Sequence, residues 1–208
     1  AAAGPHPPFH PPSNDLLMRC DKFVLLGVDC EMVNTHDGME LARVTFVNAS
    51  GQTVYDMLVK PSSRVSDYNT EFSGIDAEML AGVTRTLRDV QREILSFVGP
   101  DAYLVGHSLE GDLSALRLVH KNMIDTSELY PSPRGWPYKL GLKGLSRALL
   151  GTDIQEGDGT TGHDSAQDAT AAMRLALLKM HEGPEFGMPG PWASDPTFPR
   201  ESLFATLA

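Results

Sequence analysis

The stretch Phe23–Asp29, which reads FVLLGVD, is a continuous apolar run that ends on a carboxylate. A run of this kind, without alternating polar positions, is typical of a strand buried on both faces at the centre of a sheet. An acid at the end of a buried strand is costly unless a cation or hydrogen bonds neutralise it. The run therefore predicts both the centre of the fold and the position of a site.

Some of the segments that follow this run show the two-residue period of a strand, and others show the 3.6-residue period of a helix. Two of them are strand-like and are joined by a short turn at Ser50-Gly51, which predicts a three-stranded antiparallel start. Later segments alternate strand with helix, and together they predict an α/β fold, a mixed sheet flanked by helices. We expect strands at Leu41–Asn48, Thr53–Lys60, Tyr103–Val105 and Asn122–Ile124, and helices at Ile75–Ala81, Thr86–Val98, Glu110–Leu118, Lys143–Leu150 and Ser165–His181.

The composition fits one folded domain between a Pro-rich first segment and a Pro/Gly-rich last segment. The chain has 208 residues, 41% of them hydrophobic and 21% charged. We expect residues 1–19 to be a disordered Pro-rich lead-in, residues 20–182 to fold, and residues 183–208 to form a Pro/Gly-rich tail. No membrane-length apolar run and no secretory signal are visible, and the two cysteines, Cys20 and Cys30, indicate a reducing compartment. The net charge of -10 argues against a broad electrostatic grip on a polyanion.

Acids and one histidine recur in three separate motifs. Carboxylates are the hard oxygen ligands of divalent cations, and two such cations ~4 Å apart can neutralise the charge that develops in phosphodiester hydrolysis. A histidine nearby can take the proton from the attacking water. The residues are Asp29 and Glu31 in VDCEM, Asp112 in GHSLEGD, and His163 with Asp168 in HDSAQD.

Each motif alone has a plain structural alternative. Asp29 and Glu31 are two apart and face the same side of a strand, but such pairs also arise by chance. Asp112 could be an acid that the helix dipole favours in a first turn. His163 could be an exposed residue beside a helix N-cap, for which Asp164 is the candidate. It is the combination that favours a single metal site.

The three motifs resemble those of the DEDDh superfamily of exonucleases. More narrowly, they resemble the Rex-type RNA exonucleases and the related small-RNA-degrading nucleases. The similarity extends from about Val24 to Leu178 and includes the blocks Val65–Ile75, Met123–Thr126 and Gly141–Arg147. One departure is Gly111, where relatives often carry a longer polar residue.

The resemblance implies an RNase H-like fold, with residues 20–182 as the exonuclease domain. It implies two Mg²⁺ or Mn²⁺ ions and 3′→5′ release of nucleoside 5′-monophosphates from single-stranded RNA ends. Asp29 would bridge both ions, Glu31 and Asp168 would complete the site of the water-activating ion, and Asp112 would serve the other. His163 would be the general base. The expected substrate contacts are Met32, His107, Ser108 and Leu109.

Other readings remain open from sequence. Met32 could be an ordinary core methionine, and His107 could be structural. The same chemistry could act on DNA or on another phosphoester, and the chain could be a non-catalytic RNA-binding module of a larger RNA-processing protein. By resemblance alone, we expect an intracellular protein of the nucleus or nucleolus that does not engage membranes.

Overall fold

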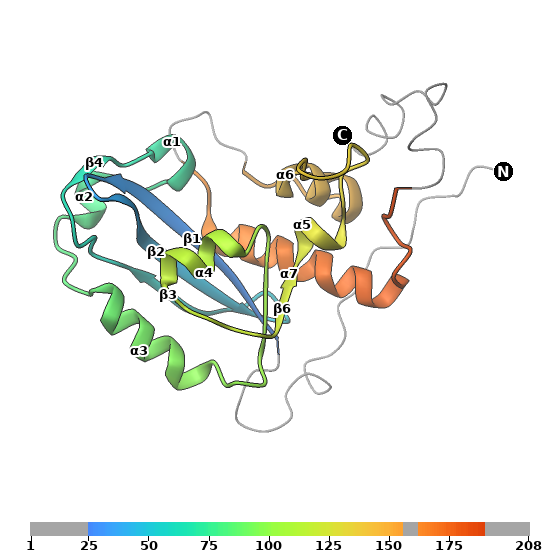
Figure 1. The fold of residues 1–208 in the computed structure, drawn as a ribbon, viewed down its shortest axis with the longest axis horizontal. Helices are drawn as coiled ribbons and strands as arrows, with labels where there is room; N and C mark the ends of the chain where they lie inside the picture. Colours follow the sequence, from blue (N-terminus) through green and yellow to red (C-terminus); the bar gives the residue numbers. More distant parts are fainter. Residues whose placement is uncertain (1–24, 156–161, 190–208) are drawn as a thin grey trace.

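A six-stranded mixed sheet forms the centre of the protein (Figure 1). The structure, a computed structural model, describes residues 25–155 and 162–189. The path is β3-β2-β1-β5-β6, and β4 pairs with the end of β1. β1 runs antiparallel to β2 and β4 and parallel to β5, so the predicted mixed sheet is confirmed. The strands are β1 (Leu25–Thr35), β2 (Gly38–Asn48), β3 (Thr53–Leu58), β4 (Val65–Asp67), β5 (Tyr103–Gly106) and β6 (Met123–Asp125).

The central strand β1 is longer than the sequence predicts. We expected it to end at Asp29, but it continues to Thr35, because β2 pairs with it as far as Thr35 opposite Gly38. The alternating burial beyond Glu31 shows a strand that is no longer covered on both faces. The expected start, Phe23, lies outside the described residues.

Helices cover both faces of the sheet (Figure 1). On one face, the even positions of β1, among them Leu26 and Val28, pack with α3 and α4 around Phe46. On the other, Leu25 and Val105 pack against α7. The helices are α1 (Thr70–Ser73), α2 (Ala77–Leu80), α3 (Leu87–Phe97), α4 (Glu110–Leu116), α5 (Thr126–Leu129), α6 (Leu142–Leu145), the π-helical turn η2 (Ser146–Leu150) and α7 (Ser165–Glu182).

The predicted long helices are present, and the errors concern short elements. The helix expected over Lys143–Leu150 is α6 followed by a π-helical turn that ends at Gly151. β4, α1 and α5 were not predicted, because elements of three or four residues are too short to show a period. The lead-in expected at residues 1–19 lies outside the described residues. Of the expected tail, Phe186 packs on the cluster that contains Tyr130.

Within the two described ranges, no helix combines the length and apolar character needed to cross a bilayer.

Candidate active site

The site forms where β1 lacks a strand on one side. β5 pairs with β1 only through Gly27, and β4 joins it only at Asn34, so Val28–Val33 have no strand on that edge in the described chain. The first turn of α4 takes this place. The backbone N–H of Cys30 donates to Asp112 Oδ1 at 2.9 Å. This bond holds Asp112 beside the strand that carries Asp29 and Glu31.

A close contact between β1 and α7 brings in the fourth acid. A Cβ atom at Gly27 would lie 2.9 Å from the carbonyl oxygen of Ala169 and 2.7 Å from Val47. Only glycine allows the helix to approach the strand this closely. Asp168, the residue before Ala169, is 4% exposed. It therefore reaches the same end of β1 as Asp29 and Glu31.

The four carboxylates are close enough to oppose one another's ionisation. Burial, followed by the charges of Asp112, Glu31 and Asp168, raises the pKa of Asp29 well above its usual value. Burial, with the charge of Asp168, raises the pKa of Glu31 to about 8. Burial likewise raises the pKa of Asp112 to about 7. The structure thus gathers the four acids that the sequence singled out.

The donor set suits a divalent cation. Glu31 Oε1 and Asp168 Oδ1 are buried and have no hydrogen-bond partner in the structure. Buried oxygens of this kind are normally paired or coordinate a metal. Yet no three His, Cys, Asp or Glu side chains of the described ranges already surround a common point as metal ligands do. The chemistry of the donors therefore fits, while their final coordination geometry requires local adjustment around the ion.

His163 lies at the rim of this cluster. Its Nδ1 is 3.6 Å from Asp168 Oδ2, and its side chain is 31% exposed. Its backbone N–H donates to the carbonyl of Phe72 at 3.0 Å. Gly162 before it has a φ of 61° and sits against Gly74, where a Cβ atom would lie 2.1 Å from the Gly74 backbone. These contacts anchor the backbone of His163 beside α1.

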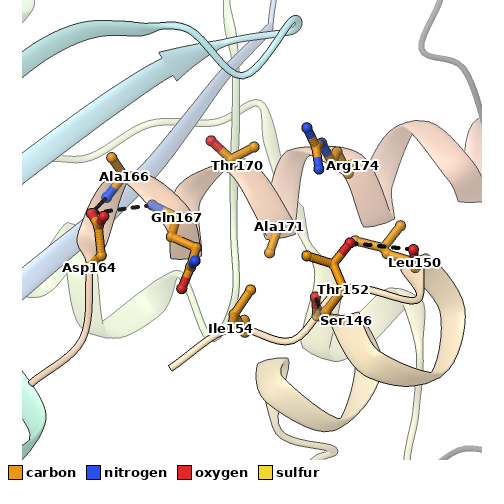
Figure 2. Close-up of a pocket in the computed structure, with 10 residues that line it drawn as sticks. All are labelled: Ser146, Leu150, Thr152, Ile154, Asp164, Ala166, Gln167, Thr170, Ala171 and Arg174. Atoms are coloured by element: carbon orange, nitrogen blue, oxygen red, sulfur yellow. Dashed lines mark hydrogen bonds between the residues drawn. The ribbon is translucent and has the colours of Figure 1, made fainter. Parts of the chain in front are cut away.

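Asp164 caps α7 and does not join the carboxylate cluster. Its side chain accepts from the N–H groups of Ala166 at 3.0 Å and Gln167 at 3.4 Å (Figure 2). The predicted capping role is confirmed. Ser165, the first residue of α7, is buried, with its hydroxyl 2.6 Å from that of Thr45 on β2. The pair ties the start of α7 to the sheet.

The loop after β5 carries three of the four expected substrate contacts. Asp125 accepts the N–H groups of Ser108 and Leu109, both at 2.9 Å, and so fixes the loop. His107 Nδ1 lies 2.9 Å from Thr126 Oγ1, and burial lowers the pKa of this imidazole. The side chain of Leu109 is 1% exposed and packs in the core, so it offers no surface to a substrate.

Met32, the remaining expected contact, is half-buried on β1 beside Glu31. It follows the acid pair directly in the chain, at the register shift between β1 and β2.

Sequence reasoning missed Gln155, which holds Asp168 in place. Its side-chain Nε2 donates to Asp168 Oδ2 at 2.6 Å, and its backbone N–H donates to Gln167 Oε1 at 3.1 Å. Lys143 donates to its carbonyl oxygen at 2.9 Å. A single glutamine has no spacing pattern, so only the folded contact reveals it.

The raised pKa values predict how metal-free stability depends on pH. In the unfolded chain Glu31 and Asp112 lose their protons near their ordinary pKa values of 4.5 and 3.8, while in the folded chain these pKa values are about 8 and about 7. Stability should therefore be greatest at low pH and fall as the pH rises through this window. One pKa unit is worth about 1.4 kcal/mol, and 1 kcal/mol moves Tm by roughly 2–4 °C in a chain of this size.

We accordingly expect Tm in EDTA to drop by at least ~5 °C between pH 5.5 and 8 in differential scanning fluorimetry. Glu31→Gln should flatten the drop, and Mn²⁺ at pH 8 should reverse it in the wild type. A Tm that rises with pH in EDTA, or a drop unchanged by Glu31→Gln, would contradict this account of the cluster.

Most of this chain is similar in sequence to known exonucleases. Residues 26–176 match the family described as Exonuclease. An uncharacterized exonuclease of Schizosaccharomyces pombe is 46% identical over 164 residues, which are 79% of this chain and 26% of that protein. Human RNA exonuclease 5 is 45% identical over 177 residues, covering 83% of this chain and 22% of the relative. RNA exonuclease 1 of Saccharomyces cerevisiae is 39% identical over 165 residues, covering 79% and 29%.

Solved structures share the fold. The catalytic unit of Neurospora crassa Pan2 superposes with a TM-score of 0.68 at 25% identity, over 81% of this chain and 30% of that one. The Pan2 module of Saccharomyces cerevisiae with AAGGAA RNA gives 0.67 at 23% identity, over 81% and 33%. These similarities support the expected RNase H-like fold. The chain spans less than a third of the length of these curated relatives.

Proposed function

Since the chain belongs to the exonuclease family, we propose that it is a metal-dependent 3′→5′ exoribonuclease that releases nucleoside 5′-monophosphates from single-stranded RNA. The observation that carries the proposal is the gathering of Asp29, Glu31, Asp112 and Asp168 at one open edge of β1. Four acids that oppose one another's ionisation destabilise the metal-free fold. Such clusters are typical of functional sites, and a bound cation would offset the repulsion. The names of the relatives, RNA exonucleases 1 and 5, support RNA as the substrate.

In this proposal the four carboxylates hold two Mg²⁺ or Mn²⁺ ions. When bound, such ions neutralise the charge on the phosphate and on the leaving oxygen. His163 acts as the base. Its Nδ1 faces Asp168, which leaves Nε2 to accept the proton of the attacking water. The partial exposure of its side chain allows the proton to pass on to solvent.

The same residues position the end of the strand. Met32, which follows Glu31 on β1, packs on the terminal nucleoside in this proposal. The loop of His107 and Ser108, held by Asp125, limits how far the strand can enter. Because Thr126 and Asp125 fix this loop through hydrogen bonds to His107, Ser108 and Leu109, it is preorganised and little ordering is needed on binding.

A digestion panel tests the proposal. Matched 5′-labelled RNA and DNA single strands, each with a free or phosphate-blocked 3′ end, are incubated with Mn²⁺ or EDTA. We expect a ladder that shortens from the free 3′ end, nucleoside 5′-monophosphates as products, faster loss of RNA than DNA, and no reaction in EDTA. Preference for DNA would assign the same chemistry to the other sugar. An intact RNA strand in Mn²⁺ would favour the non-catalytic binding module.

A further inference from the structure

The loop Pro131–Lys139 presents aromatic rings to solvent. Trp136 is 93% exposed and Tyr138 is 56% exposed. The guanidinium carbon of Arg134 lies 5.5 Å from the centre of the Tyr138 ring. Large aromatic side chains dominate cores and interfaces, so an almost fully exposed tryptophan next to a second ring is an informative departure.

The loop that carries these rings is internally bonded. Pro131 and Lys139 form an antiparallel bridge at its base. Inside it, the N–H of Gly135 donates to the carbonyl of Ser132 at 2.9 Å, and the N–H of Tyr138 donates to the carbonyl of Gly135 at 3.0 Å. A closed loop presents its rings in a fixed place, which lowers the entropy lost when something stacks on them.

The base of this loop contacts α4, the helix that carries Asp112, and α5. Lys139 Nζ is 3.5 Å from Glu110 Oε1, two residues before Asp112 on α4, and 3.6 Å from Glu128 Oε1 on α5. The backbone of Leu140, the next residue, forms a hydrogen bond with the imidazole of His107. The base of the loop is therefore connected to α4, which carries Asp112, and to His107 in the loop after β5.

The charge of the loop also differs from that of the chain. The sequence carries a net charge of -10, yet residues 131–140 contain Arg134 and Lys139 and no acid. Because Lys139 is paired with Glu110 and Glu128, Arg134 is the cation that lies beside the rings. Aromatic rings interleaved with cations match a single nucleic acid strand, whose bases stack while its phosphates meet positive charge. A duplex keeps its bases stacked on each other and cannot use such rings.

We propose that Trp136 and Tyr138 form a stacking platform for the unpaired bases that lie upstream of the 3′-terminal nucleotide. The proposal rests on the exonuclease function and adds a second contact region to it. The platform holds the strand while the terminal nucleotide is removed, so it governs the affinity for longer strands and leaves the chemical step to the carboxylates and His163.

Kinetics on substrates of two lengths tests the platform. The variants are Trp136→Ala and Tyr138→Ala. The matched control is Tyr103→Ala, because Tyr103 is 43% exposed but lies at the amino end of β5, opposite the site. For a 10-mer RNA we expect KM to rise about tenfold in either platform variant, since one stacked base contributes that order of affinity. We expect kcat within twofold of wild type, an unchanged kcat/KM for a dinucleotide, and no effect of Tyr103→Ala.

Abasic substrates separate stacking from charge. A 10-mer that lacks the second to fourth bases from its 3′ end should bind the wild-type protein as weakly as it binds Trp136→Ala. An unchanged KM for the 10-mer in both variants, or an equal loss on the dinucleotide, would overturn the platform. If the wild type cleaves neither substrate, the proposed function fails. Fluorescence anisotropy of a labelled 10-mer then still tests the platform, which predicts weaker binding to Trp136→Ala and fails if both proteins bind equally.

Discussion

Replacing Asp29 with asparagine should abolish turnover and leave the fold intact. Asparagine keeps the size of the side chain but removes a charge that burial and the neighbouring acids oppose. Without that charge the remaining carboxylates no longer hold a pair of divalent ions, and hydrolysis loses its main source of charge neutralisation. We expect no detectable nucleotide release from a labelled RNA strand in Mn²⁺.

Stability separates this prediction from simple unfolding. Because Asp29 adds to the mutual repulsion of a buried cluster, Asp29→Asn should raise Tm in EDTA at pH 8, while Mn²⁺ should no longer increase it. Asp101→Asn is the matched control. Asp101 is exposed in the turn before β5, whereas the loop of His107 follows the other end of that strand. It should leave both activity and Tm unchanged. Turnover by Asp29→Asn near the wild-type rate would refute the metal cluster.

His163→Ala should slow hydrolysis by roughly 10²–10⁴-fold, the usual contribution of a general base. Binding of Mn²⁺, followed by isothermal titration calorimetry, should stay close to wild type, because His163 lies outside the four-acid cluster at 3.6 Å from Asp168. The two readouts together distinguish a base from a ligand.

The control for this variant is His36→Ala, an exposed histidine in the turn between β1 and β2. It should keep both rate and metal affinity. If His163→Ala works at full speed, the base is another group. If it loses Mn²⁺ binding as completely as Asp29→Asn, His163 is a ligand.

Local sequence patterns predict much of this site. The apolar run before Asp29 predicts the central strand, and the two-residue period of a strand places Asp29 and Glu31 on one side. The helical period after His163 predicts α7 and its cap at Asp164, which the structure confirms. These features depend on neighbours in the chain, so the sequence alone reveals them.

Contacts between distant segments could not be predicted in this way. The bond from the Cys30 N–H to Asp112 joins residues 82 positions apart, and it exists only because β5 and β4 leave β1 uncovered between them. The clamp of Gln155 on Asp168 and the contact between Gly162 and Gly74 arise from loops without periodicity. The sequence does not reveal the exposure of Trp136 either, because a tryptophan is more simply expected in the core.

Anomalous diffraction from crystals soaked in Mn²⁺ tests the central claim most directly. The account predicts two manganese peaks about 4 Å apart, both within coordination distance of Asp29, with Glu31, Asp112 and Asp168 completing the ligands. Peaks elsewhere on the protein, or no ordered manganese beside Asp29 at millimolar concentration, would contradict it.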